Sequence, residues 1–246
     1  MFVHYRSQGF ILKKENRGES SQLFTVYTKR FGKLEISGKA IRKISSKLRS
    51  GIDIFYLSDI EFIQGKTHKT LTDAVLIEKF ENIRKNLRKL KIVSKISEVF
   101  NELVKGQEKD EKLWSLLDEI FNKLNNLQFT IYNLQLLYYY FLWNFLSILG
   151  YEPELYKCSI CQKKLVAENL YFDPEEGGVV CGHCLGKNKQ SKKIEQETVK
   201  IIRIFLKKDW QTLKKLKVNS DDLKVLKTIS DYFFLSITKG NFDISN

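Results

Sequence analysis

A change in hydrophobic period near residue 76 predicts an α+β chain in which β-strands come first and helices follow. Before that point, apolar and aromatic residues fall in short runs separated by turns. After it, they recur every three or four residues, as on one face of a helix. All four cysteines lie between residues 158 and 184, as two Cys-x-x-Cys pairs. These observations predict a β-barrel followed by an all-helical domain that carries a small inserted module.

Five strand-like segments precede residue 76. They span residues 8–13, 22–28, 33–37, 52–63 and 67–71. Between the third and the fourth, Ile41, Ile44 and Leu48 recur at helical spacing, which predicts a short amphipathic helix. Five strands with a helix between the third and fourth are the layout of an OB-fold. An SH3-like barrel and a simple β-meander are the alternatives.

Helical periodicity starts at Leu76 and continues through residues 76–103, with a break at Gly106. Further helices are expected at 113–124, 127–149, 199–206 and 223–233. The stretch 127–149 is rich in aromatic residues, so a membrane span has to be considered. Polar residues interrupt it, and no apolar run reaches the 18 residues that a span requires. We therefore expect a helix buried in a bundle, with the two C-terminal helices packed against it.

The cysteines have the spacing of a zinc site. Cys158 and Cys161 are followed, after nineteen residues, by Cys181 and Cys184, within the pattern typical of such sites. Two disulfides would need an oxidising compartment, and the N-terminus lacks the apolar core of a secretory signal. A thioredoxin-like site would need only one pair. The spacing predicts a structural Zn²⁺ held by four thiolates, with residues 169–180 as the connecting hairpin.

The zinc prediction completes the domain layout and weakens a catalytic role. We expect an OB-fold DNA-binding domain at residues 1–78 and a helical domain at 79–246, with the zinc module inserted at about 153–187. A catalytic zinc keeps one ligand position open, whereas four cysteines would close it. His183 stands between two better ligands and is expected at the surface or supporting a ligand.

Charge is distributed unevenly along the chain. The net charge is +13, which favours a polyanionic partner such as nucleic acid or a membrane surface. Residues 1–80 and 187–246 each carry +7, whereas residues 151–186 carry −3. The acidic balance of the zinc module argues against a finger that grips phosphates by itself.

The basic excess of the N-terminal part lies within residues 29–49, where eight cations face one acid, Glu35. The predicted DNA-binding residues are Lys29, Arg30, Lys33, Lys39, Arg42, Lys43, Lys47 and Arg49. Lys39, Arg42, Lys43 and Lys47 lie off the apolar stripe and are expected to face solvent. Nearby aromatic residues (Phe24, Tyr27 and Phe31) either stack on bases or form the barrel core, and burial is the usual fate of such residues.

A Gly65-Lys66-Thr67 sequence after the fourth strand is similar to the end of a phosphate-binding loop. The full motif needs a glycine five residues before Gly65, and that position is Ile60. Without the glycine-rich loop there is no phosphate cradle, so nucleotide hydrolysis is excluded.

The ordered set of motifs resembles the RecO family of bacterial DNA repair and recombination mediators. The resemblance runs from about Tyr5 to the C-terminal helices. It is carried by Gly9-Phe-Ile-Leu12, Gly18-Glu19-Ser20, Tyr27 to Lys33, Gly38 to Arg42, Ser46 to Arg49, Leu149-Gly-Tyr151, Leu155, the first cysteine pair, and Gly177-Gly-Val-Val-Cys181 with Cys184.

This resemblance implies a non-enzymatic, cytoplasmic and nucleoid-associated protein. RecO proteins bind single- and double-stranded DNA, anneal complementary strands, and work with RecR to load RecA onto strands coated by single-strand-binding protein. They also contact the acidic C-terminal tail of that protein. The alternative is a protein-interaction adaptor in which the helical bundle is the main binding surface and the cations are incidental. A zinc hydrolase is disfavoured because all four ligands are cysteines.

Overall fold

A computed structural model describes residues 3–126, 131–186, 191–216 and 218–240. Its contacts divide the chain into two compact units, Met1–Gln128 and Phe129–Asn246, which are considered separately. Among the described residues, the first unit contains five strands and three helices, and the second contains the remaining helices and the cysteine module with its short strands. The predicted domain boundary between residues 78 and 79 stays a prediction.

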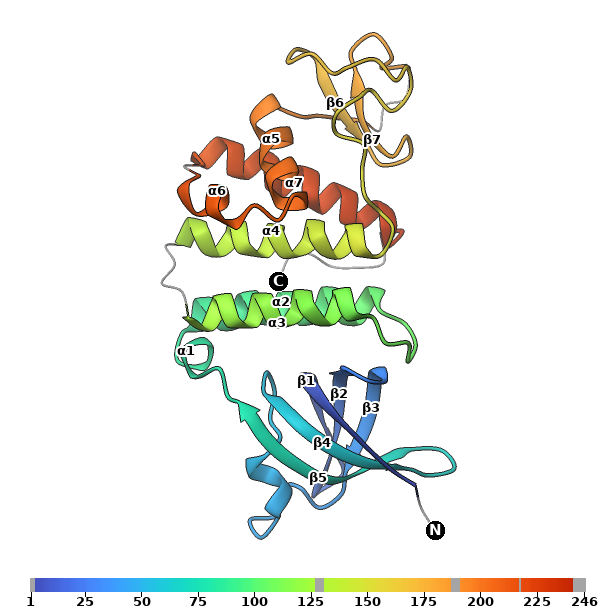
Figure 1. Ribbon diagram of the computed structural model, residues 1–246, viewed down its shortest axis with the longest axis vertical. Helices are drawn as coiled ribbons and strands as arrows, with labels where there is room; N and C mark the ends of the chain where they lie inside the picture. Colours follow the sequence, from blue (N-terminus) through green and yellow to red (C-terminus); the bar gives the residue numbers. More distant parts are fainter. Residues whose placement is uncertain (1–2, 127–130, 187–190, 217, 241–246) are drawn as a thin grey trace. The chain divides into compact units, whose positions relative to one another are not determined.

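The first unit is built on a closed five-stranded barrel with the strand order β1-β2-β3-β5-β4 (Figure 1). Its strands are β1 (His4–Arg17), β2 (Ser21–Thr28), β3 (Gly32–Gly38), β4 (Leu57–Gln64) and β5 (Lys69–Glu78). β1 pairs with both β2 and β4 in antiparallel fashion, and β3 meets β5 in a short parallel pair. This order confirms the OB-fold prediction.

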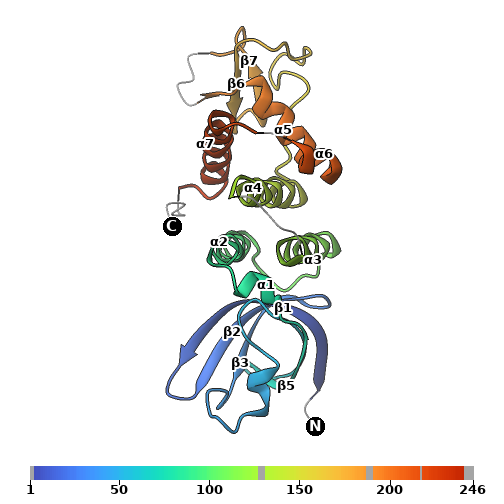
Figure 2. The same cartoon turned by 90° about the vertical axis from the view of Figure 1, so that its left-hand side faces the viewer.

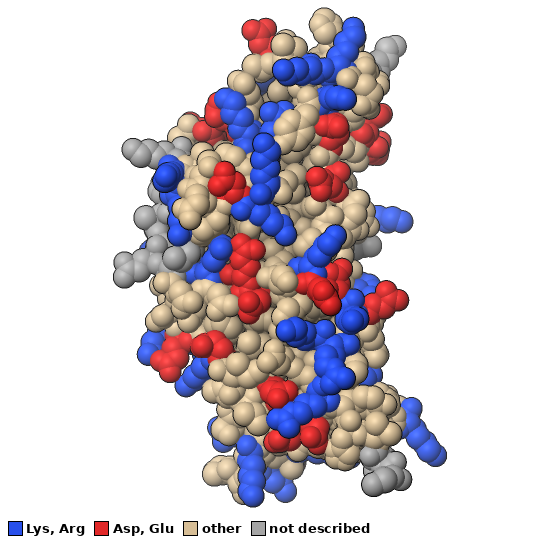
Figure 3. Space-filling view, in the orientation of Figure 1, with Lys and Arg blue, Asp and Glu red and all other residues tan. Residues whose placement is uncertain are grey.

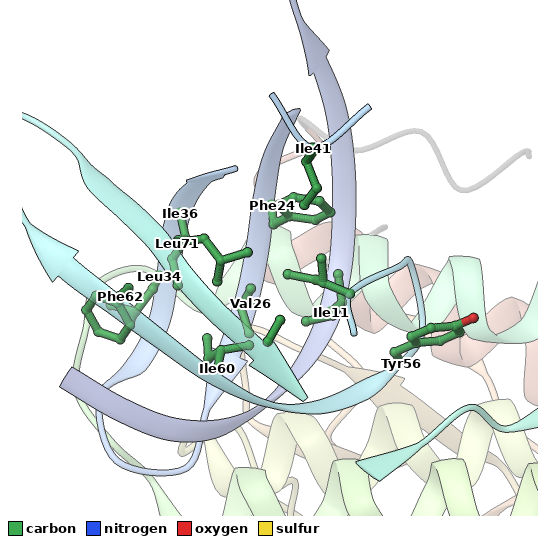
Figure 4. Packing of buried hydrophobic residues seen from close by; sticks show 12 residues of the cluster. Ile11, Phe24, Val26, Leu34, Ile36, Ile41, Tyr56, Ile60, Phe62 and Leu71 are labelled. Carbon is green, nitrogen blue, oxygen red and sulfur yellow. The ribbon is translucent and has the colours of Figure 1, made fainter. Parts of the chain in front are cut away.

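Alternation along the strands explains the barrel core. In β3, Leu34 and Ile36 are buried, whereas Lys33 and Glu35, which alternate with them, lie on the other face of the strand. The inward residues of all five strands meet in one apolar cluster (Figure 4), in which Phe24 and Val26 have no exposed surface. The aromatic residue Phe24 is therefore part of the core, as the burial alternative predicted.

The predicted helix between the third and fourth strands is wrong. Residues 39–46 form successive turns, and a single 3-10 turn, η1 (Lys47–Ser50), follows. The amide of Lys43 donates to the carbonyl of Ala40 and that of Ser46 to the carbonyl of Lys43, so the chain closes tight turns and no α-helix forms. Ile41 is buried in the barrel, but Ile44 is 95 % exposed, so the three apolar residues do not share a face.

The first helix also begins later than the pattern predicted. Leu76 belongs to β5, where it pairs with Ser58 of β4. β5 ends at Glu78. Phe80 then adopts a left-handed conformation with φ of 51° immediately before the first helix. The helices of this unit are α1 (Glu81–Arg84), α2 (Leu87–Leu103) and α3 (Glu111–Asn126). Asn86 caps α2 by accepting from the amides of Arg88 and Lys89.

Helices α2 and α3 lie side by side over one end of the barrel (Figure 2). Aromatic rings of the barrel strands pack against aromatic rings of the helices. We call these contacts, described next, the aromatic seam. Phe10 of β1 lies 5.0 Å from the ring of Trp114 and 4.9 Å from that of Phe121. Tyr27 of β2 lies 4.8 Å from Phe100 of α2 and donates its hydroxyl to the carbonyl of Asp110 at 3.2 Å.

In the second unit, four helices form the bundle, and α4 is the one expected to be buried. The helices are α4 (Ile131–Ile148), α5 (Gln196–Leu206), α6 (Trp210–Lys215) and α7 (Ser220–Ile237). Trp143 of α4 stacks on Phe233 and donates its ring N–H to Ser230 at 2.9 Å. Asn144 donates to the carbonyl of Phe205 at 2.9 Å. The predicted packing of the C-terminal helices on this segment is confirmed.

The cysteine module lies in the chain between α4 and α5, as predicted. It contains the hairpin β6 (Leu170–Asp173) and β7 (Gly178–Cys181), with β8 (Lys192–Lys193) added beside β6. The linker expected at 187–193 falls partly outside the described residues, and its last residues form β8. Among the described residues, no helix is long and apolar enough to cross a membrane.

Two glycines with positive φ allow the barrel-to-helix contact to be tested. Gly32 has φ +65°, and a Cβ there would lie 2.8 Å from the carbonyl carbon of Gln107. Gly18 has φ +62° with open space around it. Gly18→Ala should lower the free energy of unfolding by about 1–2 kcal/mol, the cost of a left-handed backbone. Gly32→Ala should lower it by about 3 kcal/mol or more, because overpacking adds to that cost. Equal losses in urea denaturation would contradict the packing at Gly32.

Candidate metal centre and nucleic-acid interface

The four cysteines converge on one point. Their Sγ atoms all lie within 4.8 Å of one another, and those of Cys161 and Cys181 are 4.0 Å apart. A tetrahedral ion with metal–sulfur distances of about 2.3 Å would place sulfur atoms about 3.8 Å apart. A disulfide would require about 2.05 Å. The geometry therefore fits a four-thiolate metal site.

Each Cys-x-x-Cys pair forms a tight turn. In the first, the amide of Gln162 donates to the carbonyl of Cys158 at 2.9 Å, and Gln162 takes a φ of 59°. In the second, the amide of Cys184 donates to the carbonyl of Cys181 at 3.0 Å. These turns bring the two sulfur atoms of each pair to the same side of the chain.

The hairpin joins the two turns. The amide of Val179 donates to the carbonyl of Glu154, and that of Ser159 to the carbonyl of Val179. The segment before Cys158 therefore lies along β7, which ends at Cys181. Gly178 allows this approach, because a Cβ there would collide with the backbone of Glu154. The contact between residues 154 and 178 thus helps to bring the first cysteine pair close to the second.

The thiols of the cluster have unequal acidity. Burial acts to raise the pKa of Cys158, but backbone hydrogen bonds from Cys161, Cys181 and Ile160 outweigh it and lower the pKa to about 6. The pKa of Cys184 is raised to about 12, chiefly by hydrogen bonds with Cys161 and Cys181. One thiolate is thus favoured near neutral pH. A divalent cation would stabilise the others by replacing the shared protons. His183 is exposed, in agreement with a surface position.

Aromatic contacts hold the module to the bundle within the second unit. Phe172 of β6 lies 5.9 Å from Trp143 and 5.3 Å from Phe233, and it is fully buried. Arg203 of α5 donates its Nε to the carbonyl of Leu155 at 3.1 Å. A metal that fixes the cysteine turns would therefore also fix the surface that meets α4, α5 and α7.

The predicted DNA-binding cations form two groups. Lys29, Arg30 and Lys33 lie at the turn between β2 and β3, whereas the other five lie beyond the far end of β3. A strand of seven residues is about 20 Å long, so the two groups lie at opposite ends of β3. At the end of the barrel formed by residues 39–50, the charged side chains in view are Lys and Arg (Figure 3). The DNA-binding role of the eight residues stays a prediction.

The first group is partly engaged in the fold. Lys33 donates its Nζ to the carbonyl of Asn101 at 2.9 Å, and its burial beside α2 lowers its pKa. Arg30 donates to the carbonyl of Arg6 at 3.2 Å and lies over the ring of Phe31. Lys29 lies over the ring of Trp114. These side chains have less freedom to follow a phosphate than the exposed cations of residues 39–49.

A groove of about 840 Å³ lies between β3 and the turn that joins β4 to β5. It is strongly basic, with one carboxylate, that of Glu35. Its cations are Arg17, Lys33, Lys39, Lys66 and Lys69, and His68 also lines it. We call this the β3 groove. The only pairs between β3 and β5 are Ile36 with Lys69 and Ser37 with Thr70, and the β4–β5 hairpin extends beyond them (Figure 1).

Sequence reasoning missed most of the groove. Arg17, Lys66, His68 and Lys69 were outside the predicted cluster, and Gly65-Lys66-Thr67 was considered only as a nucleotide loop. The signal available was a pair of lysines, Lys66 and Lys69, that follow Gly65 in the turn between two strands. Its significance depends on the parallel pairing of β3 with β5, which local patterns do not encode.

Of the aromatic residues considered for base stacking, Phe24 and Tyr27 are buried and Phe31 is half-buried. Phe24 lies in the barrel core, and Tyr27 is covered by Phe100. Phe31 packs edge-on against Tyr5 and Phe62, at 5.7 Å from each. No phenylalanine, tyrosine or tryptophan is among the described residues that line the β3 groove. The groove thus offers charge and hydrogen bonds without a stacking platform.

Family models match nearly the whole chain. The model described as "Recombination protein O N terminal" matches residues 1–80, and "Recombination protein O C terminal" matches residues 84–236. The protein named DNA repair protein RecO from Thermoanaerobacter sp. (strain X514) is 30 % identical over 246 residues, covering 97 % of this chain and 93 % of the relative.

Two further relatives carry the same name. The one from Dehalococcoides mccartyi (strain ATCC BAA-2266 / KCTC 15142 / 195) is 28 % identical over 223 residues, covering 90 % of this chain and 86 % of the relative. The one from Alkaliphilus metalliredigens (strain QYMF) is 26 % identical over 239 residues, covering 97 % and 96 %.

The metal centre can be tested by removing one ligand. Cys158→Ser should abolish stoichiometric metal binding, measured by elemental analysis of the purified chain, because a three-thiolate site is incomplete. The melting temperature should fall by several degrees, since each kcal/mol lost shifts it by about 2–4 °C in a chain of this size. His183→Ala is the matched control and should retain both properties. Full metal content in Cys158→Ser would contradict the site.

Proposed function

The chain belongs to the recombination protein O (RecO) family, and from this premise we propose that it binds DNA in the β3 groove as a non-enzymatic mediator of recombinational repair. The observation that carries the proposal is the composition of that groove, in which five cations face one carboxylate on the open side of an OB-fold barrel. OB-folds bind oligonucleotides on this face, through strands 2 and 3 and the loop between strands 4 and 5. The family membership and the groove support the same role in DNA repair and recombination.

The proposed binding mode depends mainly on phosphates. Cations that neutralise phosphates release condensed counterions, which gives affinity without sequence preference. Stacking on aromatic side chains is what favours unpaired bases in many OB-folds. Because the described lining has no such ring, we infer that both single- and double-stranded DNA bind, with little preference between them.

The exposed cations of residues 39–49 would extend the phosphate contacts. Lys39 lines the β3 groove and also begins the basic loop that contains Arg42, Lys43, Lys47 and Arg49. A DNA backbone leaving the groove at Lys39 would meet these side chains next. Cations that neutralise phosphates lower the repulsion between two DNA strands. Two complementary strands can anneal only when this repulsion is overcome.

We propose that annealing is one part of a mediator role. In this role the protein would act with RecR to help load RecA onto single-stranded DNA coated by single-strand-binding protein. The acidic C-terminal tail of that protein is the proposed second partner. The work would take place in the cytoplasm, at the nucleoid. These partners follow from the family resemblance, and no residues are assigned to them.

The proposed ion of the cysteine cluster is Zn²⁺ in a structural role. Four thiolates in a tetrahedral arrangement are typical of structural zinc and leave no position for a substrate. The ion would hold the module against the bundle, where Phe172 packs between Trp143 and Phe233. It would not take part in a reaction.

The salt dependence of DNA binding tests the β3 groove. A protein that makes six to ten phosphate contacts loses about 10³–10⁵ in affinity between 50 and 200 mM salt. Replacing Lys39, Lys66 and Lys69 with glutamine should reduce the slope of log affinity against log salt for single-stranded DNA by about 2. The matched control replaces Lys200, Lys224 and Lys227, which are exposed in the second unit, and should keep the slope. An equal loss in both variants would mean that net charge alone causes binding.

Strand annealing tests the mediator role and the adaptor alternative together. Replacing Arg42, Lys43 and Lys47 with glutamine should slow annealing of complementary oligonucleotides by about tenfold or more, because three phosphate contacts are lost. Binding of RecR and of the tail of single-strand-binding protein should be unchanged in pull-down. Unchanged annealing, with partner binding retained, would favour an adaptor whose helical bundle is the working surface.

A further inference from the structure

Ile44 occupies an unusual position in the basic loop of residues 39–50. It is 95 % exposed, the highest value among the large apolar side chains that the structure describes; the next is Leu87 at 80 %. We propose that Ile44 inserts between neighbouring bases of duplex DNA and unstacks that step. The inference rests on the proposed DNA-binding function and adds to it a residue that distorts the bound duplex.

The loop presents Ile44 on a fixed turn. Ile41 is anchored in the barrel core and Leu48 is partly buried against it. The amide of Arg42 donates to the carbonyl of Ser20, and that of Ser46 to the carbonyl of Lys43. Ile44 is thus the second residue of a hydrogen-bonded turn, between two anchored apolar residues. At 95 % exposure, the side chain gains almost nothing from burial in the fold. Because hydrogen bonds already hold the turn, insertion would cost little backbone freedom.

The charge around Ile44 suits nucleic acid. Residues 39–50 contain Lys39, Arg42, Lys43, Lys47 and Arg49 and no acid. All five side chains are exposed, and none forms an ion pair with a residue that the structure describes. A single exposed isoleucine is ordinary on a protein surface. An isoleucine within a loop that carries five exposed cations has the elements that wedges in architectural DNA-binding proteins use, where basic side chains hold the backbone and an apolar side chain enters the stack.

The loop is also continuous with the β3 groove. Lys39 belongs to both, and Ile44 follows it by five residues, so the two Cα atoms lie at most about 17 Å apart. A backbone held in the groove and by Arg42 and Lys43 would bring its bases to Ile44. Insertion would remove an exposed apolar side chain from water and partly offset the cost of unstacking. The opened step would then be the place where a duplex most easily loses or exchanges a strand.

The test uses duplex DNA that contains 2-aminopurine, whose fluorescence rises when the base unstacks. With saturating full-length protein at low salt, the fluorescence should rise several-fold. Ile44→Ser should lose most of this rise while its DNA affinity and salt slope stay close to those of the parent chain. Ile44→Met, which keeps an apolar side chain, should retain the rise. Leu87→Ser is the matched control, because it removes an exposed apolar residue outside the basic loop.

The outcomes separate the inference from the function on which it rests. A parent chain that binds DNA with a steep salt slope but causes no rise, or an equal rise in Ile44→Ser, would overturn the inference and leave the function standing. A parent chain with no salt-dependent DNA binding would overturn both. Because Ile44 lies almost wholly in solvent, an unchanged melting temperature for Ile44→Ser is expected and shows that the variant is folded.

Discussion

The aromatic seam between the barrel and helices α2 and α3 is the constraint on which the N-terminal unit depends. Phe10, Phe80, Trp114 and Phe121 form a continuous set of ring contacts, and Tyr27 adds another with Phe100. Each such pair contributes about 0.5–1.5 kcal/mol beyond the area that it buries. Because the seam covers these outward-facing parts of β1 and β2, the sheet surface left open is that of β3 and the β4–β5 turn. The charged groove lies on this uncovered part of the barrel surface.

The two compact units have different physical roles. The barrel unit has much of its excess charge in lysines and arginines that line the β3 groove or the loop at residues 39–50. The cysteine module of the second unit (residues 151–186) carries a net charge of −3, and its buried Phe172 faces the bundle helices. The most recognisable motif of the chain is therefore the one to which we assign a structural role, whereas the proposed working surface consists largely of lysines that no motif identifies. Lysines from separate segments of the chain can serve this purpose. Binding of phosphates depends on positive charge near the DNA backbone more than on a fixed ligand geometry.

Features set by local chemistry could be predicted, and features set by pairing between distant segments could not. The cysteine cluster was evident because two residues between ligands are enough to define the turn. The strands followed from alternation, and α4 from its dense aromatic content. The helix expected at Ile41, Ile44 and Leu48 was wrong because spacing does not record that the amide of Arg42 bonds to Ser20. Lys66 and Lys69 were missed because only the β3–β5 pairing brings them beside Lys33 and Lys39.

We expect DNA to bind the open side of the barrel and to leave the cysteine module untouched. Hydrogen–deuterium exchange of the full chain, with and without an oligonucleotide, tests it most directly. DNA should slow exchange in residues 33–39 and 65–70 and in the loop at 39–50. Exchange in residues 158–184 should be unchanged. Protection confined to the cysteine module or to α5 and α7, with the barrel unaffected, would contradict the account.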